Sequence, residues 1–129
     1  RMFGPLLRPH EINGLPGAYY FNLGTGLTFL LFPASIARTG LLCLSLGDPI
    51  ASIVGILLGG PIIFGTRSTL SGTAACFAVS FACVWLSLGR AVGKAFVGGA
   101  AAAVAEALSF VLDDNLLMPL STAFSLWLY

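Results

Sequence analysis

Residues 41–58 read LLCLSLGDPIASIVGILL, an apolar run of 18 residues in which Asp48 is the one charged side chain. A helix that crosses a bilayer needs about 20 mainly apolar residues, and the run has this length when it is extended back to Thr39. A carboxylate facing lipid near the middle of such a helix costs at least about 2.5–3.5 kcal/mol, so Asp48 is a candidate functional residue. The neighbouring Gly47 and Pro49 predict a kink or break in the helix here. An Asp48 that only pairs with an arginine to join helices is the structural alternative.

The composition of the whole chain is that of a membrane protein. Of its 129 residues 57% are hydrophobic and 9% are charged, and the mean hydropathy is +0.96. Soluble domains carry about a quarter charged residues, because these cover the surface that faces water. The formal net charge of +1 gives no basic stripe, which argues against a nucleic-acid partner. We therefore predict an integral, multi-pass membrane protein with lipids as partners; endoplasmic reticulum, plastid and bacterial inner membrane are not distinguished.

Five apolar runs, separated by Gly, Pro or charged residues, predict five membrane-spanning helices. The expected fold is all-α, a polytopic transmembrane bundle in a single membrane domain over residues 1–129. Because the chain begins with Arg1 and shows no cleavable signal, we expect a fragment of a longer polytopic protein. Glycine pairs with the spacing that permits close helix packing leave an oligomer open; they are Gly55/Gly59 and Gly89/Gly93. The helices are expected at residues 18–36, 39–58, 70–88, 91–112 and 115–129.

Five crossings place three polar segments on the same face of the membrane: the amino-terminal segment, the loop after residue 58 and the loop after residue 112. The first of the two loops contains Arg67, and the second contains the sequence Asp-Asp-Asn at 113–115. Basic residues are divided equally between the two faces, so the positive-inside rule gives no orientation. At 1.5 Å per residue, Asp48 lies about 15 Å below Gly59 and Glu106 about 10 Å below the second loop. Two recessed carboxylates are thus expected beneath one polar face.

The loop at residues 59–73 reads GGPIIFGTRSTLSGT, and it combines one cation with several hydroxyl groups. Arg67, hydroxyls and free backbone amides just before a helix can bind an oxyanion, because a helix start presents unpaired N–H groups. An ordinary Ser/Thr helix cap is the alternative. Asp113, Asp114 and Asn115 offer oxygen ligands of the kind that Mg²⁺ accepts, and a solvated turn between helices is the alternative there.

The order of these features resembles the polyprenol kinase family, which comprises dolichol, phytol and farnesol kinases and the CTP-dependent diacylglycerol kinase. The family is related to the phosphatidate cytidylyltransferases. The resemblance implies transfer of the terminal phosphate of a nucleoside triphosphate, often CTP, to a lipid alcohol such as a polyprenol, a phytol-like alcohol or diacylglycerol, with Mg²⁺ or another divalent ion. The matching stretches are Glu11, 19–24, 47–55, 68–73, Glu106, and 113–116 through 119–120.

The resemblance also implies roles for individual residues. Asp48 and Glu106 would be catalytic, with Glu106 accepting the proton of the alcohol or binding a second ion. The metal ligands would be Asp48, Asp113 and Asp114. The groups that bind the nucleotide would be Arg67, Ser68, Thr69, Gly72, Thr73 and Asn115. A prenyl tail would lie between helices lined by Phe29, Phe77, Phe81 and Phe110.

The chain departs from the family at one motif. The family's loop usually reads Lys-Ser-x-Glu-Gly-Ser/Thr, whereas residues 68–73 read STLSGT, so the lysine and the glutamate are absent. Arg67, one position early, is the nearest cation, and arginine and lysine differ in geometry. A cytidylyltransferase-like CMP transfer, a carrier that uses intramembrane carboxylates, and a non-catalytic member of the family are the alternatives to the kinase.

Overall fold

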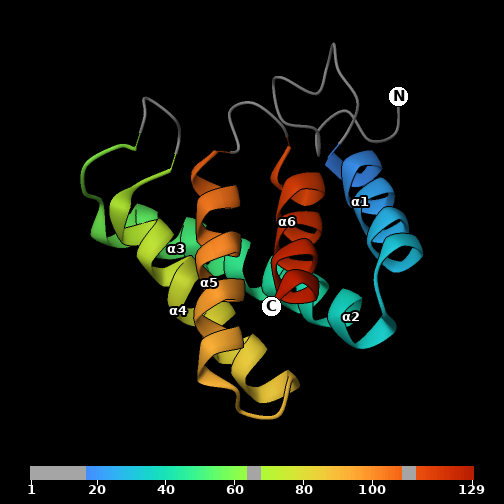
Figure 1. Ribbon diagram of the computed structural model, residues 1–129. Helices are drawn as coiled ribbons and strands as arrows, with labels where there is room; N and C mark the ends of the chain where they lie inside the picture. The colour runs from blue at the N-terminus through green and yellow to red at the C-terminus, as the bar shows by residue number, and fades with distance from the viewer. Residues whose placement is uncertain (1–16, 64–67, 109–112) are drawn as a thin grey trace.

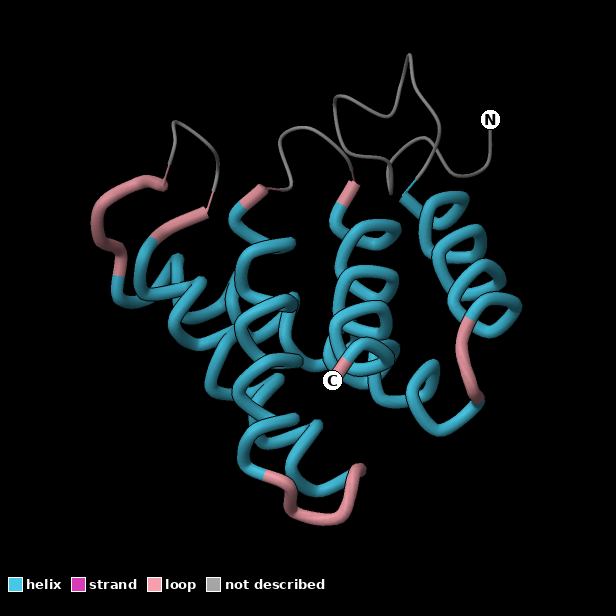
Figure 2. The backbone as a smooth tube through the Cα atoms, viewed as in Figure 1, coloured by secondary structure: helices cyan, strands magenta, loops and turns pink. Residues whose placement is uncertain are grey.

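The computed structural model describes residues 17–63, 68–108 and 113–129, and within these ranges the regular structure is helical (Figures 1 and 2). An isolated bridge between Ile62 and Thr69 is the one β pairing there. The all-α prediction is therefore confirmed for the described residues. The elements are α1 (Gly17–Leu31), α2 (Ala34–Leu42), the π-helical segment η3 (Cys43–Gly47), α3 (Asp48–Leu58), α4 (Leu70–Ser87), α5 (Val92–Ala107) and α6 (Asp114–Leu128).

The elements α2, η3 and α3 form a single helix of 25 residues, Ala34–Leu58. Its widened π turn has a cause in the sequence: Pro49 has no N–H, and in a regular α-helix its ring would collide with the carbonyl of Ser45, four residues earlier. Ser45 falls inside η3, where the wider turn accommodates the proline. The predicted distortion next to Asp48 is thus confirmed, and it is a bulge rather than a break.

The boundary between the first two helices differs from the prediction. We expected helices at 18–36 and 39–58, whereas α1 ends at Leu31 and the next helix begins at Ala34. The break is at Phe32 and Pro33, because a residue that precedes proline disfavours the helical conformation. The predicted helices at 70–88 and 115–129 agree with α4 and α6 within one residue at each end. The helix predicted at 91–112 begins at Val92 but ends at Ala107, five residues early, with Leu108 as its C-cap; residues 109–112 lie outside the described residues.

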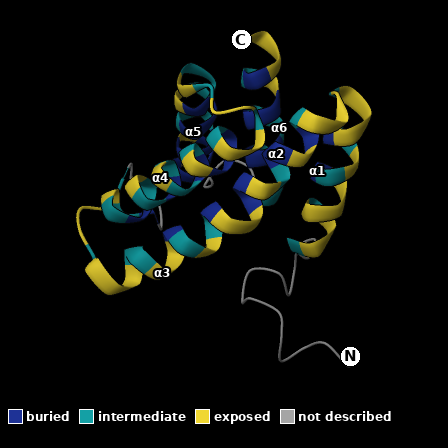
Figure 3. Ribbon diagram, turned by 90° about the horizontal axis from the view of Figure 1, so that it is seen from below, coloured by how far each residue is buried: buried dark blue, intermediate teal, exposed yellow. Residues whose placement is uncertain are grey.

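Within the part of the chain that the structure describes, two helices are long and apolar enough to cross a membrane, Ala34–Leu58 and Leu70–Ser87, with mean hydropathies of 2.1 and 1.6. The helices α1, α5 and α6 are shorter, at 15, 16 and 15 residues. Figure 3 shows that buried residues face neighbouring helices and that exposed residues lie on the outer sides. The five-span arrangement stays a prediction.

Glycines allow the helix backbones to approach closely. A Cβ atom on Gly40 of α2 would lie 2.8 Å from the Pro119 carbonyl oxygen of α6, and one on Gly24 of α1 would lie 2.5 Å from that of Asn115. Both contacts are with backbone atoms, so α1 and α2 pack directly on α6, as helices do where lipid supplies no hydrophobic drive for pairing. The buried core extends from these contacts to α4 and α5; its largest members are Met118, Val84, Leu44 and Leu126.

The predicted glycine pairs divide into two groups. Gly55 packs against Thr69, and Gly93 contacts the Tyr129 ring. Gly59 and Gly89 have no neighbour that a Cβ would meet within 4 Å, so the prediction that they form packing faces is wrong. Both have positive φ, +63° and +73°, which glycine adopts readily, and they end the helices α3 and α4 instead.

The helix ends gather as the sequence predicts. Figure 1 shows the start of α1, the end of α3 with the start of α4, and the end of α5 with the start of α6 at the top of the molecule, while the turn between α4 and α5 lies at the bottom. The polar segments that follow residues 58 and 108 therefore start at one end of the bundle.

We expect Gly40→Ala to lower the free energy of unfolding by about 1–3 kcal/mol, because the new methyl group would collide with backbone rather than with a movable side chain. Gly26→Ala is the matched control: it also lies in a helix, has no atom within 4 Å of its Cβ position, and should be neutral or stabilising. Thermal unfolding of the purified protein in detergent measures both. Equal melting temperatures for the two variants would contradict the close contact of α2 with α6.

Candidate functional site

The loop between α3 and α4 is held closed by its own hydrogen bonds. The Ile63 N–H donates to the Ser68 carbonyl and the Leu70 N–H donates to the Pro61 carbonyl, both at 3.0 Å. The Ser71 hydroxyl donates to the Gly59 carbonyl across the loop. The described residues on the two sides of the loop are thus fixed relative to one another and to the first turn of α4. Arg67 lies outside the described residues, so its role in phosphate binding stays a prediction.

Thr69 begins α4 as its N-cap. Its Oγ1 atom accepts a hydrogen bond from the Gly72 N–H at 3.2 Å and lies 3.1 Å from the Ser71 hydroxyl. This is the Ser/Thr helix cap that the sequence left as the alternative. What the structure shows for Thr69 and Gly72 is the capping hydrogen bond between them. Their roles in nucleotide binding stay predictions.

Gly72 lets α4 lie against the helix that carries Asp48. A Cβ on Gly72 would be 2.7 Å from the carbonyl oxygen of Ala51, which lies on α3 one turn after Asp48. On the facing helix Gly55 makes room for the Thr69 hydroxyl, at 2.7 Å from its Cβ position. The glycines in these two motifs therefore place the loop beside α3.

Glu106 joins the same loop to the end of α5. Its Oε2 atom accepts a hydrogen bond of 2.6 Å from the Thr73 hydroxyl, and its backbone carbonyl accepts one of 3.2 Å from the Ser68 hydroxyl. The side chain is buried, at 7% exposure, and Ser68 is 8% exposed. Three predicted site residues thus meet, although the chain separates Ser68 from Glu106 by 38 positions.

Asp113, Asp114 and Asn115 form a compact polar cluster at the start of α6. The Asn115 N–H donates to the Oδ1 atoms of Asp113 at 3.1 Å and of Asp114 at 2.9 Å. Its side-chain amide donates to the same two oxygens, at 2.8 and 3.2 Å. Asp113 is also the N-cap of α6, so the two carboxylates are oriented around a single asparagine.

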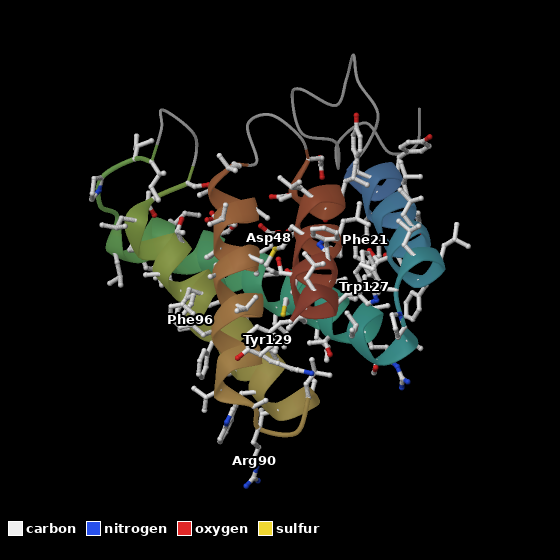
Figure 4. All side chains as sticks on the ribbon, viewed as in Figure 1. Phe21, Asp48, Arg90, Phe96, Trp127 and Tyr129 are labelled. Atoms are coloured by element: carbon white, nitrogen blue, oxygen red, sulfur yellow. The ribbon has the colours of Figure 1, made fainter. Side chains whose placement is uncertain are left out.

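Asp48 lies where η3 joins α3, near the centre of the molecule, and is partly buried (Figure 4). Asp48, Glu106 and Asp114 come from three different helices, α3, α5 and α6. The expected meeting of Asp48 and Glu106 beneath the polar end stays a prediction.

The predicted metal ligands are all hard oxygen donors, which is the donor set that Mg²⁺ prefers. Among the described residues no three His, Cys, Asp or Glu side chains lie close enough together to hold a metal ion. The paired carboxylates of Asp113 and Asp114 carry like charges at close range, and a divalent cation would relieve their repulsion. The chemistry of these donors fits the ion, and the assignment of Asp48 to the same ion stays a prediction.

An apolar groove of about 450 Å³ runs between α5 and α6, and the sequence analysis missed it. Of the phenylalanines expected to contact a lipid tail, Phe29, Phe77 and Phe81 do not line it, and Phe110 lies outside the described residues. The run of small residues at 100–103 is the signal that could have indicated the groove, because small side chains leave space between helices. Its lining is Phe96, Val97, Ala100, Ala101, Val104, Ala105, Leu108, Leu117, Ser121 and Ser125.

Comparison with known proteins identifies a relative of this chain. No family model and no solved structure matches it. The CTP-dependent diacylglycerol kinase 1 of Schizosaccharomyces pombe is 31% identical over 146 residues, an alignment that covers 99% of this chain and 66% of the relative. The similarity therefore includes every element described above, while the relative is the longer protein. By this relationship, and by the order of motifs that carries it, the chain belongs to the polyprenol kinase family that includes the CTP-dependent diacylglycerol kinases.

Proposed function

We propose that this chain is the membrane-embedded, catalytic part of a CTP-dependent lipid kinase that phosphorylates a lipid alcohol, with diacylglycerol as the expected substrate. The observation that carries the proposal is the meeting of Ser68 and Thr73 with Glu106 at the start of α4, together with the cluster of Asp113, Asp114 and Asn115 at the start of α6. The name of the relative, a CTP-dependent diacylglycerol kinase, supports CTP as donor and diacylglycerol as acceptor. Polyprenols and phytol-like alcohols are the competing acceptors.

The outer surface supports a multi-pass membrane arrangement. Large apolar side chains are strongly exposed, among them Leu30 at 79%, Ile56 at 83% and Leu57 at 76%. Apolar surface of this extent is unfavourable in water and is covered by hydrocarbon in a bilayer. In our proposal all five helical rods cross the membrane, and the ends that carry Ser68 and Asp113 lie on one side of it.

The proposed reaction is phosphoryl transfer. The lipid hydroxyl attacks the terminal phosphorus and passes its proton to a carboxylate of the site, the bond from that phosphorus to the bridging oxygen breaks, and CDP leaves. Little covalent chemistry falls to the protein, so catalysis depends on positioning and on neutralising phosphate charge. A divalent ion, when bound, neutralises charge on the phosphate oxygens; Asp113 and Asp114 would hold it, and the family resemblance adds Asp48 as a third ligand. The loop at 68–73 would position the triphosphate, and Asn115 would keep the two acidic side chains of α6 oriented.

The groove between α5 and α6 is suited to one hydrocarbon chain of the lipid. From Phe96 to Leu108 it extends about 18 Å at 1.5 Å per residue, which is close to the thickness of one leaflet, about 15 Å. Its upper lining residue on α6, Leu117, lies three residues from Asp114, or about 4.5 Å along the helix. A lipid whose chain occupies the groove would therefore present its hydroxyl near the carboxylates.

We expect Asp48→Asn and Asp114→Asn each to lower kcat for phosphorylation of diacylglycerol by about 100-fold, because each removes charge while preserving shape. The assay follows label from the γ-phosphate of CTP into extracted lipid, on the full-length protein in detergent micelles. An unchanged melting temperature shows that the variants fold. Retention of full turnover by both variants would overturn the proposed mechanism.

The products distinguish a kinase from the related cytidylyltransferases. We expect CDP and lipid phosphate in equal amounts, with label from the γ-phosphate in the lipid and label from the α-phosphate in CDP. If pyrophosphate is released and label from the α-phosphate enters the lipid, the reaction is CMP transfer and not phosphorylation. Running diacylglycerol, a polyprenol and phytol in parallel identifies the acceptor.

Filling the groove should weaken lipid binding alone. We expect Ala101→Trp to raise the KM for long-chain diacylglycerol at least tenfold and to leave the KM for CTP unchanged, because the indole would occupy the chain's volume. Ala78→Trp, on the exposed side of α4, is the matched control and should change neither constant. Equal KM values for lipid in the two variants would show that the chain lies elsewhere.

A further inference from the structure

The hydrogen bonds of Glu106 suggest a different task from the proton transfer that the family resemblance implies. A general base must reach the proton that it abstracts, within hydrogen-bond distance or through one water. Glu106 is 7% exposed, and its Oε2 atom already accepts the Thr73 hydroxyl at 2.6 Å. The carboxylate is thus directed at the protein's own α4 and is largely covered.

The same residue contacts the loop at two points. The Thr73 hydroxyl meets the Glu106 side chain, and the Ser68 hydroxyl meets its backbone carbonyl at 3.2 Å. Ser68 and Thr73 are the first and last residues of the phosphate-loop motif, and Thr69 between them caps α4. Glu106 therefore connects both ends of this motif to α5.

Glu106 is also related to the position of the acidic pair Asp113 and Asp114 at the start of α6. Glu106 lies in the last turn of α5, seven positions before Asp113, the N-cap of α6. The α5 and α6 helices pack on each other, and their ends lie side by side at the top of the molecule (Figure 1). The separation between the phosphate loop and the acidic pair thus depends on where α5 ends relative to α4.

We propose that Glu106 is a positioning residue: its bond to Thr73 holds residues 68–73 against the end of α5, and so sets the distance between the loop that binds CTP and the carboxylates of α6. This inference rests on the proposed function for its effect on catalysis, whereas the bond itself is independent of it. The Glu106 carboxylate is buried and the Thr73 hydroxyl is partly buried, so either group left without its partner is an unsatisfied polar group, which displaces the loop.

The test compares variants that keep or remove the bond. Glu106→Gln retains an oxygen that accepts from Thr73, and Thr73→Ser retains the donor; we expect both to raise the KM for CTP less than the variants that remove the bond. Glu106→Ala and Thr73→Val should each raise the KM for CTP about tenfold, with a smaller change in kcat. The double variant should be no worse than either single one, because both remove the same interaction.

Thr39→Val is the matched control, since Thr39 is also buried but donates within its own helix, to the Ser35 carbonyl at 2.8 Å. It should leave the KM for CTP unchanged. A 100-fold loss of kcat in Glu106→Gln at unchanged KM would overturn the inference and assign proton transfer to Glu106. Additive effects of Thr73→Val and Glu106→Ala would overturn it too.

Hydrogen exchange gives a measure that does not need activity. We expect the amides of residues 69–73 to exchange faster in Glu106→Ala and Thr73→Val than in wild type or in Thr39→Val. If the wild-type protein transfers no phosphate from CTP, the proposed function is wrong. The exchange data then still test whether the bond between Glu106 and Thr73 holds the loop. Equal exchange in all variants would show that Glu106 does not hold the loop.

Discussion

The structure depends on how a proline is accommodated inside its longest helix. Pro49 removes one backbone donor from the helix Ala34–Leu58 and would clash with the turn before it, so that turn widens into η3. Gly47, in the widened turn, leaves room for Met118 of α6 and for Ser80 and Cys76 of α4. The helix therefore passes close to both partners at the point where Asp48 emerges. Without the bulge, the helix would not bring Asp48 close to α4 and α6 in this way.

The candidate site consists of helix ends that backbone contacts bring together. Gly24 of α1 lies against the carbonyl of Asn115, whose amide groups orient the two carboxylates of α6. On the other side of the site, Gly72 places the start of α4 on the backbone of α3. A membrane interior offers no hydrophobic force to press helices together, so such contacts, with hydrogen bonds, define the geometry. A residue such as Gly24 can therefore matter to the site without contacting any substrate.

All four hydroxyl groups of residues 68–73 have a structural partner in the described residues. Thr69 caps α4, Ser71 bonds the end of α3, and Ser68 and Thr73 both bond Glu106. The family's lysine and glutamate are absent from this motif. The amides of Leu70 and Gly72 at the start of α4 also donate within the loop, to the Pro61 carbonyl and the Thr69 hydroxyl, so the loop itself orders this segment.

The sequence by itself determined the all-helical class of the fold and most helix positions. Composition and run length carry this information, because apolar runs of helical length bounded by Gly, Pro or charged residues predict helices. It did not determine the break at Pro33, which a count of apolar residues passes over, nor the packing role of Gly59 and Gly89, where φ decides and spacing does not. The tertiary structure alone decided that Glu106 meets Thr73 across 33 positions and that small residues of α5 leave a groove beside α6. Both features depend on the rotation of neighbouring helices about their axes and on the distance between those axes. Contacts between segments that are distant in the chain set these two quantities.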